Sequence, residues 1–99
     1  MKLEDMTKTE YEIYAIFDKV YNGHKNVFTP HILGYGKISK TLIYEFSSGK
    51  DIFSDNKMWG VSILKLEEGE WKNNKELSSA FSSAKEAEDY IISLKENNK

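Results

Sequence analysis

The stretch WGVSILKLEEGEWKNNKELSSAFSSAKEAEDYIISLK, residues Trp59–Lys95, decides the fold of this 99-residue chain. It contains, in order, an alternating apolar run, an acidic turn, a polar connection and a helix with a clear N-terminal cap. A strand is predicted at residues 57–66 and a helix from about Ser83 onward. The stretch contains no catalytic, metal-binding or phosphate-binding motif, so it predicts architecture and leaves the activity open.

The predicted strand at 57–66 changes face along its length. Trp59, Val61 and Ile63 share one face by their alternation, whereas the leucines that follow, from Leu64 on, lie on the other. This switch predicts a twist or bulge near Leu64, or a strand end that passes under a helix.

An acidic turn, Glu67–Glu70, follows the strand. Its glycine, Gly69, can adopt a positive φ, which a tight turn requires. After the turn, Trp71 is expected either to pair briefly with the preceding strand or to cover the edge of the core.

The final helix has the clearest local pattern in the chain. The Ser83 hydroxyl can cap the helix by accepting a hydrogen bond from the backbone of Glu86. Acidic residues occupy the first turn and Lys95 lies near the C-terminus, as the helix dipole favours. Phe81, just before the cap, is expected to pack back onto the apolar stripe of the helix. That stripe comprises Ala84, Ala87, Ile91 and Leu94.

Residues 7–23, TKTEYEIYAIFDKVYNG, allow two interpretations. Their aromatic and β-branched residues favour a strand by propensity. The apolar residues, however, recur at intervals of three and four, Thr7 and Glu10 form a T-x-x-E capping box, and Asn22–Gly23 supply a stop. We predict a helix, with a strand buried on both faces as the alternative.

Two further strands are expected in the middle of the chain, at about residues 32–38 and 41–47. The second has the alternation of a half-buried strand. In the polar connection that follows it, Ile52 and Phe53 are expected to tuck under the edge of the sheet.

Together these elements predict an α+β fold with the order α-β-β-β-α. The sheet should be antiparallel and three-stranded, with both terminal helices packed on one face. A single domain is expected at residues 7–96, between a loose N-terminus at 1–6 and a C-terminal tail at 97–99.

This order, over about residues 8–96, resembles the topology of the double-stranded RNA-binding domain. That family places a lysine-rich cluster at the start of its second helix, where it grips phosphates. The matching segment here is SSAKEAED, in which Lys85 stands among Glu86, Glu88 and Asp89. RNA binding is therefore not carried over to this chain.

Composition narrows the possible functions. The chain has no cysteine, which excludes disulfides, thiolate nucleophiles and cysteine-based zinc sites. A net charge of −2 gives no field that would attract a polyanion, and all 14 basic residues are lysine, which disfavours arginine-dependent phosphate recognition. No apolar run is long enough to span a membrane or to form a secretion signal, so a soluble cytoplasmic protein without a cofactor is expected.

Few residues could support catalysis. His24 and His31 are the only histidines and lack metal-ligand spacing, so no metal site is expected. Gly34–Lys37 and Ser48–Asp51 resemble phosphate loops faintly and are interpreted as turns. No catalytic residue is assigned, because an enzyme would need a pocket that joins a histidine to an aspartate such as Asp55.

The sequence thus favours a small non-enzymatic binding module whose expected partner is another protein. The hypothesis includes an inhibitor or accessory factor encoded by a phage or plasmid and directed at a host nucleic-acid-binding or defence protein. The expected contact residues are sheet aromatics and turn carboxylates: Trp59, Trp71, Tyr35, Tyr44, Glu67, Glu68 and Glu70. The alternative is a nucleic-acid-binding domain that uses lysines beside aromatic residues, such as Lys72 next to Trp71. The oligomeric state is left open.

Overall fold

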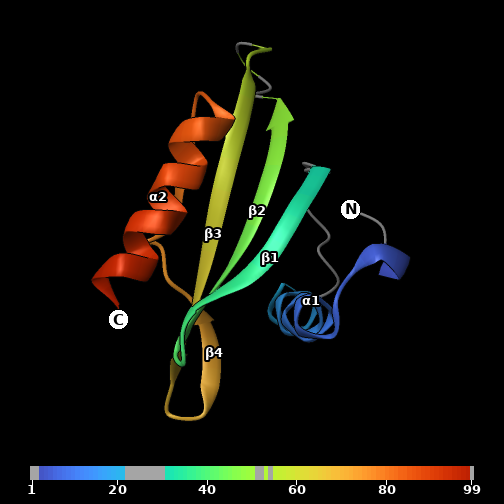
Figure 1. The fold of residues 1–99 in the computed structure, drawn as a ribbon, viewed down its shortest axis with the longest axis vertical. Coiled ribbons are helices and arrows are strands. Elements are labelled where there is room, and N and C mark those ends of the chain that lie inside the picture. Colours follow the sequence, from blue (N-terminus) through green and yellow to red (C-terminus); the bar gives the residue numbers. More distant parts are fainter. Residues whose placement is uncertain (1–2, 22–30, 51–52, 54, 99) are drawn as a thin grey trace.

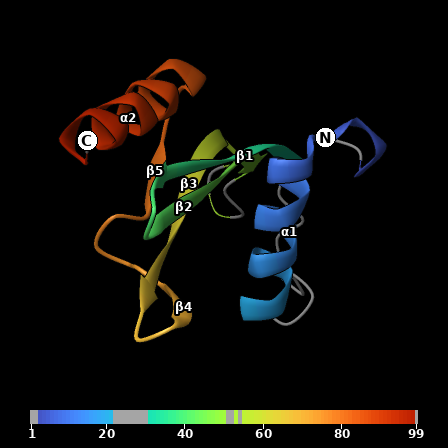
Figure 2. The same cartoon turned by 60° about the horizontal axis from the view of Figure 1, so that its bottom comes forward.

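The computed structural model describes residues 3–21, 31–50, 53 and 55–98. It shows an α+β fold in which a twisted antiparallel sheet lies between two helices (Figure 1, Figure 2), so the predicted fold class is confirmed. In chain order the elements are a 3-10 turn (Leu3–Asp5), α1 (Lys8–Val20), β1 (His31–Ser39), β2 (Leu42–Lys50), β3 (Lys57–Glu67), β4 (Glu70–Asn73), β5 (Ser79–Phe81) and α2 (Ala84–Asn97).

The sheet contains five strands rather than the three expected. β1, β2 and β3 pair in sequence order, close to the predicted bounds. The additional strands, β4 and β5, both pair with the outer side of β3. They are short, at four and three residues, which is why the alternation of apolar residues did not reveal them.

In the segment between β4 and β5, a side chain takes over the hydrogen bonding to the outer side of β3. The Asn74 N–H donates to the Ile63 carbonyl oxygen at 2.9 Å, and the Ile63 N–H donates to the Ser78 hydroxyl at 2.9 Å. The Ser78 hydroxyl in turn donates to the Asn74 carbonyl at 2.8 Å. A serine hydroxyl here takes the place of a backbone partner, so the outer side of β3 is covered from Trp59 to Glu67.

α1 is a helix, which decides between the two interpretations of residues 7–23. The Thr7 hydroxyl accepts a hydrogen bond from the Glu10 N–H at 3.1 Å, and the Glu10 carboxylate accepts one from the Thr7 N–H at 3.2 Å. This reciprocal pair is the predicted capping box. The helix ends at Val20, and the predicted stop at Asn22–Gly23 lies outside the described residues.

α2 begins and packs as predicted. The Ser83 hydroxyl accepts a hydrogen bond from the Glu86 N–H at 3.2 Å. The rings of Phe81 and Tyr90 lie 5.2 Å apart, so Phe81 does pack back onto the helix. The buried residues of α2 all belong to the predicted stripe and are Ala87, Ile91 and Leu94.

Each face of the sheet has its own core. The buried residues of the core beneath α2, here the α2 core, are Ile38, Leu42, Val61, Ile63, Ala87, Ile91 and Leu94. Those of the core beneath α1, here the α1 core, are Ile13, Phe17, Tyr35, Ile43 and Leu64. Of the two cores, the α1 core is the one with buried aromatic residues, Phe17 and Tyr35.

The two helices therefore pack on opposite faces, and the expected packing on one face is wrong. Neighbours in β2, Leu42 and Ile43, belong to different cores, and so do Ile63 and Leu64 in β3. Because successive strand residues point to opposite faces, these strands carry apolar side chains on both sides and need a helix on each. The switch at Leu64 thus marks a strand end beneath a helix, since the β2–β3 register continues through it without a bulge.

The expectation that Phe53 tucks under the edge of the sheet is also wrong. Its side chain is 92% exposed, and Ile52 lies outside the described residues. The neighbouring described residues, Lys50 and Asp55, are exposed as well, so Phe53 lies in a part of the described chain that faces solvent.

The β3–β4 hairpin closes with a two-residue turn, because Glu67 pairs with Glu70. Its central residues both have positive φ, +51° at Glu68 and +81° at Gly69. This is the combination of a type I′ turn, whose twist matches that of the flanking strands. The predicted positive φ of Gly69 is confirmed, and Glu68 shares a conformation that glycine and asparagine adopt more readily.

The Tyr44 ring occupies the space beside Gly36, its cross-strand partner on β1. A Cβ atom at Gly36 would lie 2.5 Å from the Tyr44 hydroxyl oxygen and 2.6 Å from the nearest ring carbons. The Lys95 Nζ lies 5.4 Å from the centre of the same ring, in cation–π contact. Gly34, two residues earlier, has no heavy atom of the described chain within 4 Å of its own Cβ position, its two chain neighbours aside. A side chain at position 36 would therefore displace the Tyr44 ring, whereas one at position 34 would not.

Replacing Gly36 with alanine should lower the free energy of unfolding by about 1–3 kcal/mol, because the methyl group would displace the Tyr44 ring. Gly34→Ala is the matched control, and its free energy of unfolding should stay within about 0.5 kcal/mol of wild type or rise slightly. Urea unfolding followed by tryptophan fluorescence measures both variants. Equal effects of the two substitutions would contradict the contact with Tyr44.

Replacing Glu68 with asparagine should raise the free energy of unfolding by about 0.5–1 kcal/mol, because asparagine accepts the left-handed conformation at lower cost. Glu67→Asn removes the same charge one residue earlier, at a strand position, and should bring no gain. Thermal and urea unfolding of both variants test the expectation, and a gain shared by the two would point to charge rather than backbone conformation.

Candidate binding site

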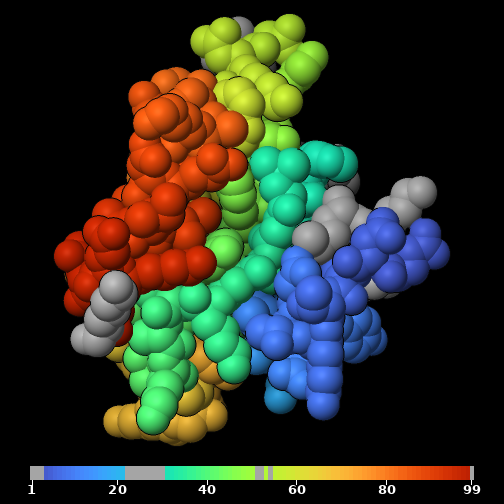
Figure 3. Space-filling view, viewed as in Figure 1, coloured from blue at the N-terminus to red at the C-terminus, as the bar shows by residue number. Residues whose placement is uncertain are grey.

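A groove of about 620 Å³ runs between α2 and β1. Gly34 of β1 and Tyr44 and Phe46 of β2 line it from the sheet, and Ile91 and Ile92 line it from α2. The space-filling view shows β1 at the surface between the two helices (Figure 3). The groove is therefore open to solvent along one edge of the sheet.

A bulge in β1 turns an apolar side chain toward this groove. Ile32 pairs with Ser47 and Gly34 pairs with Phe46, so Leu33 is the extra residue between them. Bulges of this kind redirect a side chain out of the regular alternation. Ile32 packs against the α1 core, whereas Leu33 lines the groove and is 39% exposed.

Two of the four large apolar residues that are exposed in the described chain lie at this groove. Leu33 lies on one side, and Ile92 of α2, which is 52% exposed, lies on the other. Between them Gly34 leaves open space, because no described residue other than its chain neighbours lies within 4 Å of its Cβ position. Exposed apolar side chains around a hollow are typical of a surface that another molecule covers.

Two carboxylates and one ammonium group complete the described lining. Glu10 comes from α1 and Glu88 from α2, and both line the groove. Lys95 also lines it, but its ammonium group lies against the Tyr44 ring. The centre of the groove is thus apolar, and the charge around it comes mainly from the two carboxylates, Glu10 and Glu88.

β1 is the long open edge of the sheet. It pairs with β2 on one side, and no strand in the described part of the chain pairs with its other side. From Gly34 to Lys37 its register with β2 is regular, so this part of the strand is straight. Alternate N–H and C=O groups of such an edge point outward and can accept another strand.

On the opposite side of the sheet lies a buried polar pair. The Tyr35 hydroxyl donates a hydrogen bond to the Glu45 carboxylate at 2.9 Å, and each residue is only 5% exposed. Burial, followed by the neighbouring Glu45 charge, raises the pKa of Tyr35, and the same two causes raise the pKa of Tyr21. The pair is closed off from solvent and holds β1 to β2 within the α1 core.

The aromatic residues expected to contact a partner lie largely inside the fold. Tyr35 is buried in the α1 core, and Trp71 is partly buried against it. Trp59 and Tyr44 are partly buried against the α2 core, with the Lys57 Nζ 5.2 Å from the centre of the Trp59 ring. Of these four aromatics, Tyr35 and Tyr44 line the groove. Trp71 pairs with β3 and also packs against the α1 core, so both positions expected for it are observed together.

The acidic residues of the turn lie elsewhere. Glu67, Glu68 and Glu70 are all exposed, at the tip of a hairpin that extends beyond the rest of the sheet (Figure 1). Lys65 is near this tip, with its Nζ 3.9 Å from the Glu67 carboxylate. None of the three carboxylates lines the groove, so the structure separates the acidic turn from the aromatic residues.

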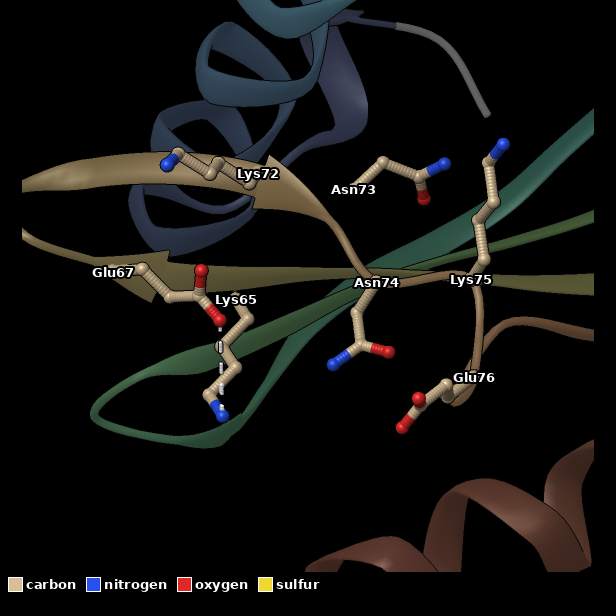
Figure 4. Close-up of a pocket in the computed structure, with 7 residues that line it drawn as sticks. All are labelled: Lys65, Glu67, Lys72, Asn73, Asn74, Lys75 and Glu76. Carbon is tan, nitrogen blue, oxygen red and sulfur yellow. Dashed lines mark ion pairs between the residues drawn. The ribbon is translucent and has the colours of Figure 1, made fainter.

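A second hollow, of about 490 Å³, lies beside the same hairpin. Its lining is mixed in charge and comprises Lys65, Glu67, Lys72, Asn73, Asn74, Lys75 and Glu76. Figure 4 shows the ammonium groups of Lys65, Lys72 and Lys75 pointing in different directions rather than toward one point. Trp71 faces α1 while its neighbour Lys72 projects to the other side of the hairpin, so the two do not form a joint stacking surface.

The described residues that were weighed for catalysis occupy exposed positions. His31 lies at the exposed start of β1, and Asp55 is exposed with its carboxylate 3.7 Å from the Lys50 ammonium group. His24 lies outside the described residues. Among the residues that are described, no group of three His, Asp or Glu side chains could hold a metal ion.

No protein-family model, curated protein or solved structure was found to match this chain. Within the described ranges, no helix is long and apolar enough to cross a membrane. The function is therefore inferred from the geometry of the groove itself.

Of the residues that line the groove, sequence reasoning selected only Tyr35 and Tyr44 as contact residues. It missed those that leave the groove open and apolar, among them Leu33, Gly34 and Ile92. Ile92 did carry a signal, because it is an apolar residue outside the buried stripe of its helix. Leu33 carried none, since its exposure depends on a bulge that only the pairing with β2 reveals.

Replacing Tyr35 with phenylalanine should lower the free energy of unfolding at neutral pH by about 1–3 kcal/mol, because the buried Glu45 carboxylate loses this donor. Tyr11→Phe removes a hydroxyl from a tyrosine that is 54% exposed and should change the stability little. Urea unfolding at pH 7 measures both. Similar losses in the two variants would contradict a structural role for the Tyr35–Glu45 hydrogen bond.

The same pair should make the fold sensitive to alkaline pH. The pKa of Tyr35 is raised in the folded state, so the folded protein keeps a proton that the unfolded chain loses above about pH 10. Its contribution is complete below that pH and decreases as the pH rises. The free energy of unfolding should therefore fall more steeply above about pH 10 in wild type than in Tyr35→Phe. Parallel pH profiles would contradict this expectation.

Proposed function

We propose that this chain is a non-enzymatic module of the cytoplasm that binds another protein through the open edge of β1 and the groove beside it. The observation that carries the proposal is the coincidence of three features at one place. The first is an edge strand without a described partner on its outer side. The second is a pair of exposed apolar side chains, Leu33 and Ile92, and the third is the open hollow that they line. Open sheet edges and exposed apolar patches are surfaces that proteins otherwise avoid or cover.

The positions of the aromatic rings favour a protein over a nucleic acid as the partner. Single-stranded nucleic acids bind to exposed aromatic rings flanked by basic side chains. Here Tyr35 is buried, the Tyr44 ring abuts Gly36, and Trp71 packs toward α1, away from the side of Lys72. The groove itself is lined by Glu10 and Glu88, which would repel phosphates.

The acidic turn supports a narrower form of the proposal. Glu67, Glu68 and Glu70 extend from the sheet at an exposed tip, where their charge suits a basic surface. A protein that binds nucleic acid presents such a surface, so the chain would act as an inhibitor or accessory factor of a nucleic-acid-binding or defence protein. A phage or plasmid origin is consistent with that role.

Site-specific photo-crosslinking in a lysate of the source organism tests this function. A benzoylphenylalanine at Ile92, beside the groove, should cross-link to a defined protein. The same group at Glu76, which is exposed beside the second hollow, should not. The protein identified is then purified, and its binding is measured with the wild-type chain.

The competing function makes a different prediction in the same set of experiments. A nucleic-acid-binding domain should bind DNA or RNA at about 50 mM salt and lose most of that affinity by about 200 mM. Such behaviour, together with no protein cross-link at position 92, would reject the proposed function. Charge reversal of Glu67, Glu68 and Glu70 tests the acidic turn separately, because unchanged capture of the same protein would remove it from the contact surface.

A further inference from the structure

We propose that the partner contributes an extended segment that pairs with the outer edge of β1 and inserts one large apolar side chain into the space over Gly34, beside a basic residue. This inference rests on the proposed function and names the chemistry of the segment that the groove accepts. Three independent features of the site support it: the edge, the space and the charge.

The edge supplies the backbone hydrogen bonds. The register of β1 with β2 is regular over residues 34–37, and within the described chain the other side of this stretch has no strand partner. A segment that pairs with it continues the sheet order and satisfies the outward N–H and C=O groups. The opposite side of the sheet offers no comparable edge, because β4 and β5 there are only four and three residues long.

The space supplies a position for one side chain. Residues directly opposite each other in a sheet share a face, and Gly34 faces α2 together with its partner Phe46. Beyond its chain neighbours, no described residue has a heavy atom within 4 Å of the Cβ position of Gly34, and the groove around it is lined by apolar groups that include Ile91. An added strand alternates its side chains between the two faces, so every second residue points toward α2 and the groove. Exposed Leu33 and Ile92 would then cover the inserted side chain.

The negative charge of the groove favours a basic residue next to the inserted apolar side chain of the partner. Glu10 from α1 and Glu88 from α2 bring carboxylates to the groove, while the Lys95 ammonium group is held against Tyr44. A lysine or arginine in the bound segment gains from these carboxylates, whereas an acidic residue is repelled. The segment is therefore apolar at its centre and basic at its flank.

The open space over Gly34 allows a test that leaves the fold intact. Gly34→Val places a branched side chain where no described residue beyond the chain neighbours lies within 4 Å, and valine is favoured in strands. The variant should keep the wild-type urea midpoint and lose the space for the inserted side chain. Lys72→Val is the matched control, because it adds valine to an exposed strand position away from the groove.

The probe is a displayed library of random nine-residue peptides selected on the immobilised full-length chain. The retained peptides should share a large apolar residue flanked by lysine or arginine. A selected peptide, made synthetically, should bind Gly34→Val at least tenfold more weakly than wild type and should bind Lys72→Val equally well. On binding, hydrogen exchange should slow at the β1 amides between residues 34 and 37.

A second variant tests the charge without disturbing the helix cap. Glu10→Gln keeps the capping box, since glutamine serves at that position, and removes the charge. Combined with Glu88→Gln, it should weaken the binding of the selected basic peptide about threefold or more, with a smaller effect at high salt.

Each outcome bears on the inference. Peptides that bind Gly34→Val as well as wild type, an acidic consensus, protection of amides outside β1, or no enrichment over a blank support would each overturn it. A concentration-dependent dimer that Gly34→Val abolishes, with no peptide enriched, would assign the edge to a second copy of the chain instead. If a protein cross-links at Ile92 but still binds Gly34→Val, the proposed function survives and the extended-segment inference fails.

Discussion

The apolar character of β2 and β3 on both faces is the constraint on which the rest of the structure depends. Adjacent residues such as Ile63 and Leu64 belong to separate cores, so a helix on one face alone would leave the apolar side chains of the other face exposed to water. α1 and α2, from opposite ends of the chain, each cover one of these faces. The groove between them is a consequence of this division, because β1 is the part of the sheet that lies at the surface between the helices (Figure 3).

The two edges of the sheet differ in how their backbone groups are covered. β4, the Asn74–Ser78 segment and β5 together cover the outer side of β3, and a serine hydroxyl completes the hydrogen bonding where the backbone does not. β1 has no such cover in the described chain, although it has nine residues. An uncovered edge of this length promotes unwanted pairing, and the proposed binding role would account for its retention beside an apolar groove.

Gly34 and Gly36 show how one residue type serves two purposes in a single strand. Both face α2, but Tyr44 fills the space beside Gly36, whereas no described residue fills the space beside Gly34. The first contact stabilises the pairing of β1 with β2, and the second position leaves room in the groove. The polar pair Tyr35–Glu45 anchors the strand from its other face, so β1 is held firmly while its outer edge stays open.

Local patterns in the sequence determined the helices, their caps and the three long strands, because capping boxes, apolar periodicity and turn glycines act over a few residues. They also determined the positive φ of Gly69 in its tight turn. The placement of the helices on opposite faces, the strands β4 and β5, and the groove were decided only by the tertiary structure. Each of these depends on pairing between distant residues, as when the register of β1 with β2 makes Leu33 a bulge, or when Ser78 replaces a strand partner for Ile63. Long-range contacts of this kind leave no fixed spacing in the chain. The aromatic residues that were expected to bind a partner are therefore largely internal, and the exposed apolar surface lies beside Gly34.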